Sequence, residues 1–150
     1  KRMKRRHNPE DVNNFIERCR KVREEITFGA DIIAGFPTEN EKMFQNTYNL
    51  LNDNQISHLH IFPFSPKKNT PAARMPQLEK SIIKKRAQDL RLLGDNILSL
   101  VKKNLSDERK ILIEELNTHH ISGYDQNYIK HQIPMIGMSL GEIVTTQCSF

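Results

Sequence analysis

The sequence predicts a mixed α/β fold, in which helix–strand units around a parallel sheet precede a small all-β module. Helical and strand periods alternate along residues 9–62, and a long helical pattern covers 78–105. Short alternating segments with turn residues between them follow it. We therefore expect a domain boundary near residue 105, with an α/β unit at 1–105 and a β module at 106–150.

The first expected helix covers about residues 9–24. Asn8 is a favourable capping residue and Pro9 suits the first helical position. Apolar side chains then recur at helical spacing, at Val12, Phe15, Ile16, Cys19 and Val22.

Two short apolar segments predict neighbouring strands of a buried, parallel sheet. Residues 26–34 are rich in isoleucine and end at Gly35 and Pro37, and residues 57–62 carry Leu59 and Ile61. A helix is expected between them at about 40–53, with Glu39 as its candidate cap.

A long helix is expected over 78–105, which Gly94 either weakens, by about 1 kcal/mol relative to alanine, or bends. Beyond it, residues 110–114, 127–133 and 141–146 have the alternation of short strands.

The composition favours a folded protein with an anionic partner. The 150 residues carry a formal charge of +5, which makes nucleic acid the leading candidate. No apolar run approaches the ~20 residues that span a bilayer, and no apolar stretch follows the basic start, so neither a membrane span nor a secretory signal is expected. Cys19 and Cys148 form neither a disulfide framework nor a metal motif, which indicates the reducing cytoplasm.

The end of the first strand is a candidate binding site. Ligands of parallel α/β folds bind at the carboxyl ends of strands. There, Gly35 permits close approach of a ligand to the backbone, Phe36 offers an apolar surface and Pro37 fixes the turn. The alternative is an ordinary turn between strand and helix.

The end of the second strand is a second candidate. Phe62, Pro63 and Phe64 present aromatic rings between prolines, and Lys67 and Lys68 follow as candidate phosphate contacts. The alternative is that both rings belong to the core. His58 and His60 lie on one face of this strand, but no carboxylate or cysteine completes a metal set there.

An ordered series of motifs resembles the C-terminal half of the radical S-adenosylmethionine (SAM) tRNA methylthiotransferases. The match is best with the group that modifies threonylcarbamoyladenosine at tRNA position 37. The family's basic, GFP, FPYSP, TPAARM and GYTxxY segments correspond to residues 3–7, 31–40, 60–66, 70–75 and 123–130.

The resemblance implies the second half of a partial (β/α) barrel that binds SAM, closed by the long helix. It assigns to the SAM pocket Gly35, Phe36, Pro37, Phe62, Pro63 and Phe64, with Arg5 as a further charged candidate. The family's reaction also needs [4Fe–4S] clusters, and two distant cysteines cannot supply their ligands. We therefore expect this chain to be inactive alone and to need an N-terminal half that carries the cluster domains.

The resemblance also makes residues 106–150 a TRAM-like RNA-binding barrel, with the tRNA anticodon stem-loop as partner. Because the sequence ends where family members commonly continue, we expect this barrel to be truncated. Candidate RNA contacts are Tyr124, Tyr128 and Lys130, together with Lys67, Lys68 and Arg74. The alternative is that both tyrosines fill the small core.

Two departures from the family pattern concern backbone conformation. Thr38 and Asn69 stand where the family has glycine, so Thr38 is strained if its position requires a positive φ, whereas asparagine tolerates one. Two alternatives stay open. One is a stand-alone RNA-binding module that uses the basic loop and the TRAM-like tail, and the other is an inactive remnant of a split gene, which Thr38, Asn69 and the early end of the sequence favour.

Overall fold

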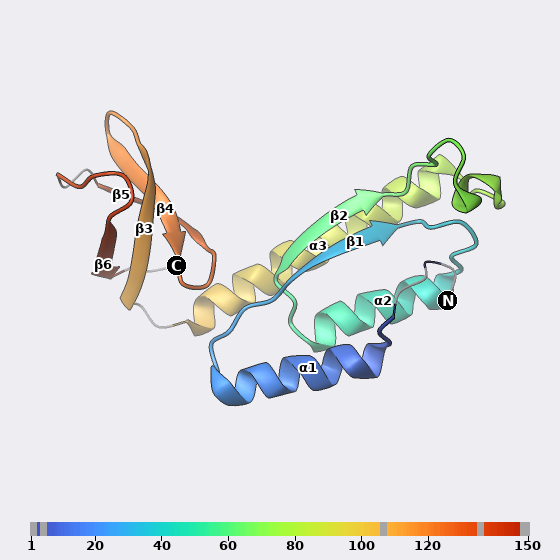
Figure 1. The fold of residues 1–150 in the computed structure, drawn as a ribbon, viewed down its shortest axis with the longest axis horizontal. Coiled ribbons are helices and arrows are strands. Elements are labelled where there is room, and N and C mark those ends of the chain that lie inside the picture. Colours follow the sequence, from blue (N-terminus) through green and yellow to red (C-terminus); the bar gives the residue numbers. More distant parts are fainter. Residues whose placement is uncertain (1–2, 4–5, 106–107, 135–136, 148–150) are drawn as a thin grey trace. The chain divides into compact units, whose positions relative to one another are not determined.

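The computed structural model describes residues 3, 6–105, 108–134 and 137–147. The contacts between residues divide the chain into two compact units. Figure 1 shows the helices and strands of each unit. The first unit comprises Lys1–Glu24 and Phe28–Val101, and the second comprises Glu25–Thr27 and Lys102–Phe150. The mixed α/β character that the sequence predicts is confirmed.

Asparagine side chains cap the first two helices. Helix α1 spans Pro9–Val22, and Asn8 caps it as predicted, with its Oδ1 accepting a hydrogen bond from the Asp11 N–H at 2.9 Å. Helix α2 spans Glu41–Asp53, and Asn40 accepts from the Met43 N–H at 2.9 Å. The expectation that Glu39 caps α2 is wrong, because the asparagine next to it has the shorter side chain that the capping geometry needs.

Strands β1, Gly29–Ala34, and β2, His58–Pro63, form a two-stranded parallel sheet, as the sequence predicts. The pairing sets Ala30 opposite Leu59 and Ile32 opposite Ile61. Strand β1 begins three residues later than the apolar segment suggests.

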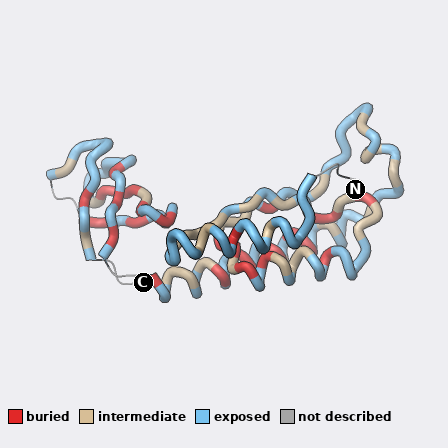
Figure 2. Tube along the Cα trace, turned by 60° about the horizontal axis from the view of Figure 1, so that its bottom comes forward, coloured by how far each residue is buried: buried red, intermediate tan, exposed pale blue. Residues whose placement is uncertain are grey.

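One face of this sheet carries the core of the first unit. Ala30, Ile32 and Ala34 share that face with Leu59 and Ile61. All three helices pack against it, through a cluster that includes Ile16, Phe44, Leu51, Ala87, Leu90, Leu93 and Ile97. Figure 2 shows buried residues as red segments along the helices and strands. The opposite face, with Asp31, Ile33, His60 and Phe62, is exposed.

Helix α3, Lys80–Asn104, is the long helix predicted from the sequence, and a short 3-10 helix, Pro71–Arg74, precedes it. Gly94 lies inside α3 at a close contact, since an added Cβ would lie 3.2 Å from Leu59 Cδ1. The glycine therefore lets α3 lie close to β2. None of the described helices is long and apolar enough to cross a membrane.

The second unit contains a four-stranded antiparallel sheet in the order β5-β4-β3-β6. Its strands are β3 (Glu108–Leu116), β4 (His120–Asp125), β5 (Lys130–Pro134) and β6 (Ile143–Gln147). Isoleucines 111, 113, 121 and 133 form its core with Val144. The sequence did not predict β4, and it placed residues 127–129 in a strand although they lie between β4 and β5.

Candidate functional site

The strand end after β1 is a tight turn whose geometry demands a positive φ. The Glu39 N–H donates to the Phe36 carbonyl oxygen at 2.9 Å, which closes a four-residue turn with Pro37 second and Thr38 third. Thr38 has a φ of 70°. Proline at the second position and a positive φ at the third define a type II turn, in which glycine is favoured at the third position. The strain expected of Thr38 is therefore present.

We predict that this strain is measurable in a pair of substitutions. Thr38→Gly and Thr38→Ala both remove the hydroxyl and the branched side chain, but only glycine adopts a φ of 70° without steric cost. Thr38→Gly should therefore be more stable than Thr38→Ala by about 1 kcal/mol in urea unfolding. Equal stability of the two variants would show that the turn relaxes.

Gly35, which precedes the turn, is held close to helix α3. Its φ is 75°, and an added Cβ would lie 2.7 Å from Ile83 Cγ1. Arg86 fixes the other end of the turn, because its Nη1 donates to the Glu39 carboxylate at 2.7 Å and to the Glu39 carbonyl at 3.0 Å. The packing of the turn against α3 thus explains, without any role in ligand binding, why residue 35 is a glycine.

The predicted aromatic residues separate onto two surfaces. Phe36 and Phe64 meet edge to face, with ring centroids 5.5 Å apart, so the two strand ends do come together. Phe62, in contrast, belongs to the exposed face of the β1–β2 sheet and is 53% exposed. Pro37 is buried. Arg5 lies outside the described residues.

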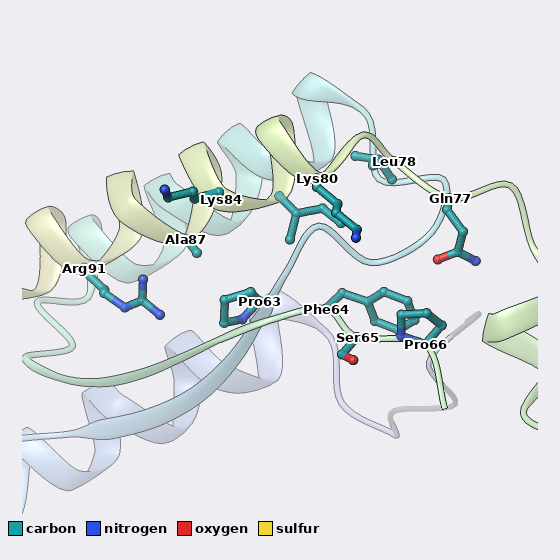
Figure 3. Close-up of a pocket in the computed structure, with 11 residues that line it drawn as sticks. Pro63, Phe64, Ser65, Pro66, Gln77, Leu78, Lys80, Lys84, Ala87 and Arg91 are labelled. Atoms are coloured by element: carbon teal, nitrogen blue, oxygen red, sulfur yellow. The ribbon is translucent and has the colours of Figure 1, made fainter. Parts of the chain in front are cut away.

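A pocket of about 420 Å³ lies between the segment after β2 and the first half of α3. In Figure 3, Phe64 and Pro66 line one side of it, and Lys84, Ala87 and Arg91 extend from α3 on the other. Arg91 is oriented by the β2 backbone, since its Nη2 donates to the Ile61 carbonyl at 3.1 Å.

The basic loop after this pocket is ordered by its own turn. The Thr70 N–H donates to the Lys67 carbonyl at 3.2 Å, and Asn69 has a φ of 66° at the third position. Asparagine at this second positive-φ site costs less than threonine at the first. Lys67, Lys68 and Arg74 are exposed, and within the described residues none of them forms an ion pair.

In the second unit, Tyr124 and Tyr128 form a stacked pair with ring centroids 4.8 Å apart. Tyr124 is on β4. Tyr128 has a φ of 60°, and its N–H donates to the Asp125 carbonyl oxygen at 3.0 Å, which closes a four-residue turn. Tyr128 is 71% exposed, so this ring does not fill the core.

Lys130 is held in an ion pair beside these rings. Its Nζ lies 3.1 and 3.0 Å from the two carboxylate oxygens of Glu115. The Ser122 hydroxyl also donates to Glu115 at 2.7 Å, and these bonds from Ser122 and Lys130 lower the pKa of Glu115. The hydrogen bond to Glu115 raises the pKa of Lys130. A phosphate at Lys130 would have to compete with this carboxylate.

A buried polar network holds the loop that carries Tyr128. Asp125 Oδ1 accepts from the Asn127 and Ile129 N–H groups at 2.8 and 3.0 Å. Its Oδ2 lies 2.9 Å from both Arg109 Nε and His131 Nε2. Burial opposes ionisation of Asp125, but the bonds from Ile129, His131, Asn127 and Arg109 hold its pKa below the ordinary value.

Asn127 extends this network to residues 25–27, which belong to the same unit. Its side chain accepts from Arg109 and donates to the Glu25 carbonyl, and its own carbonyl accepts from the Thr27 hydroxyl at 3.0 Å. Arg86, Arg109 and His131 were not predicted from the sequence as residues of a site. Only the alternation of Arg109 with buried Ile111 and Ile113 could have signalled that it faces the core.

The chain is thus an α/β protein in which one unit has a parallel sheet with aromatic strand ends, and the other has an antiparallel sheet beside the exposed Tyr128. No protein-family model matches the chain. It is 46% identical, over 83% of its length, to a threonylcarbamoyladenosine tRNA methylthiotransferase of Rickettsia prowazekii. It is 33% identical over 95% of its length to the enzyme of that name from Thermotoga maritima.

A tRNA-2-methylthio-N(6)-dimethylallyladenosine synthase of Photobacterium profundum is 33% identical over 75% of the chain. The chain belongs to the tRNA methylthiotransferase family, as its motifs predict. It spans only 24–33% of the length of these relatives.

Proposed function

We propose that this chain is part of a tRNA methylthiotransferase that adds a methylthio group to C2 of N6-threonylcarbamoyladenosine at position 37. The observation that carries the proposal is the 46% identity to a relative named for threonylcarbamoyladenosine. In this proposal, residues 1–105 form the second half of a radical SAM barrel and residues 106–150 form a TRAM-like RNA-binding module. Cysteines outside this chain would bind the iron–sulfur clusters. The proposed location of the enzyme is the cytoplasm.

The described strand ends are compatible with SAM. The exposed face of the β1–β2 sheet offers Phe62 and Ile33 as apolar surface. The backbone of Gly35, Phe36 and Pro63 lies at the carboxyl ends of these strands, where ligands of parallel sheets bind. SAM would supply the reactive group when bound, and the chain's own residues would hold its adenosine.

A chimera tests this function directly. In it, this chain replaces the matching segment of the Rickettsia prowazekii relative, so that the rest of the enzyme supplies what the chain lacks. The expected result is formation of the 2-methylthio nucleoside in tRNA, read by mass spectrometry of digested nucleosides. A folded chimera without product would contradict the proposal.

A stand-alone RNA-binding role is the second candidate, and the exposed ring of Tyr128, stacked on Tyr124, favours it. We predict that Tyr128→Ala weakens binding of the chain to single-stranded RNA about tenfold, because a stacked base is worth about 1–3 kcal/mol. Tyr128→Phe keeps the ring and should bind like the wild type. Fluorescence anisotropy at low salt measures both, and equal binding by Tyr128→Ala would contradict the prediction.

A further inference from the structure

The pocket beside α3 has apolar walls and a cationic rim. Its walls include Pro63, Phe64, Leu78 and Ile83, from the segment after β2 and from α3 with its lead-in. Among the described residues that line the pocket, three are cationic, Lys80, Lys84 and Arg91, and none is a carboxylate.

The charges on the rim are available to a ligand. Lys80 and Lys84 are exposed, and neither forms an ion pair within the part of the chain that the structure describes. Two carboxylates, Glu39 and Glu41, form ion pairs with α3, and both pair with Arg86, at 2.7 and 3.1 Å. An anion that enters the pocket therefore meets uncompensated positive charge.

We infer that this pocket binds one unpaired nucleotide of an RNA strand. The base lies against Phe64 and the neighbouring prolines, and the adjoining phosphates lie on Lys80 and Lys84. A volume of about 420 Å³ suits a ligand of this size. Apolar and aromatic walls accept the face of any base, and lysines contact the backbone without regard to sequence.

The loop beyond the pocket identifies RNA as the source of this nucleotide. Pro66, in the pocket wall, is followed directly by Lys67 and Lys68, and then by Arg74 in the 3-10 helix. A strand that leaves the pocket would meet a second set of exposed cations, which a single free nucleotide would not reach. This inference rests on the proposed function, because it takes tRNA as the partner.

Charge reversal and narrowing of the pocket test the inference on the 150-residue chain. The probe is a fluorescein-labelled single-stranded RNA heptamer at 50 mM salt, with an anticodon stem-loop as a second probe. The double variant Lys80→Glu/Lys84→Glu is expected to bind about tenfold more weakly and with a shallower salt dependence. Ser65→Phe, which leaves the charge unchanged, is expected to weaken binding about fivefold by occupying the pocket.

The matched control is Lys85→Glu/Lys42→Glu, which makes the same charge change at two exposed lysines outside the pocket. Circular dichroism verifies that each variant folds. Ultraviolet cross-linking with mass spectrometry should place RNA on peptides that contain residues 63–66 or 77–91.

If the pocket variants bind like the control, or if cross-links fall only on residues 124–130, the pocket inference fails while RNA binding stands. If the wild-type chain binds neither probe, the inference fails as well. The methylthio product of the chimera, which is measured separately, then decides whether the proposed function fails with it.

Discussion

Replacing Asp125 by alanine is expected to lower the free energy of unfolding of the second unit by about 3–5 kcal/mol. The substitution removes the carboxylate that lies 2.9 Å from Nε of Arg109, whose side chain is fully buried, and so takes away its attraction for the guanidinium charge. It also removes the acceptor of the Asn127 and Ile129 N–H groups. Asp125→Asn retains one oxygen for these groups and is expected to lose less stability.

Hydrogen exchange read by mass spectrometry in peptides from residues 108–134 measures this loss, because it reports on the second unit separately. Glu114→Ala is the control, as it removes an exposed carboxylate from β3 and should change stability by no more than about 0.5 kcal/mol. Wild-type protection in Asp125→Ala would show that the network does not stabilise the sheet.

The same network predicts the direction of acid sensitivity. Because the folded-state pKa of Asp125 lies below its ordinary value of 3.8, its stabilising contribution is present above about pH 3.8. That contribution is lost as the pH falls further, through the folded-state pKa. Asp125→Asn should therefore lose less stability than the wild type when the pH is lowered through this range.

The elements that the sequence predicts well are those with local causes. Asn8 and Pro9 start α1 because capping depends on residues within one turn. Strand β1 was predicted from its run of apolar residues, but Ile33 lies on the exposed face of the sheet, so the expectation that this strand is buried on both faces is wrong. The strand β4 escaped prediction because its letters, HISGYD, contain serine and glycine in place of alternating apolar residues. Its neighbours β3 and β5 supply the pairing that makes it a strand.

The candidate sites could be predicted only in part, for a similar reason. The two strand ends were predicted to be adjacent, and in the structure their residues Phe36 and Phe64 are in contact. They cannot show that Phe62 and Phe64 line different surfaces, which depends on where α3 packs. The Arg109–Asp125–His131 cluster contains one residue from each of three strands, so no local spacing in the sequence predicts it.

Replacing Gly123 by alanine is the second change with a large expected effect. Gly123 lies on β4 opposite Ile113, next to the irregular pairing between Ile113 and Glu115. A Cβ at this position would overlap the Leu112 carbonyl oxygen. A clashing side chain could rotate away from the new Cβ, but the Leu112 carbonyl belongs to the backbone. Strands β3 and β4 would therefore have to separate. We expect a loss of about 3 kcal/mol or more.

Gly137→Ala distinguishes this overlap from the general cost of losing a glycine. Gly137 has a φ of 60° and nothing within 4 Å of an added Cβ, so only the backbone cost of about 1–2 kcal/mol applies there. Hydrogen exchange in peptides from β3 and β4 should rise sharply in Gly123→Ala and only slightly in Gly137→Ala. Similar exchange in both variants would mean that the two strands can move apart at little cost, and the Tyr124 ring, one residue further along β4, would then lack a fixed position.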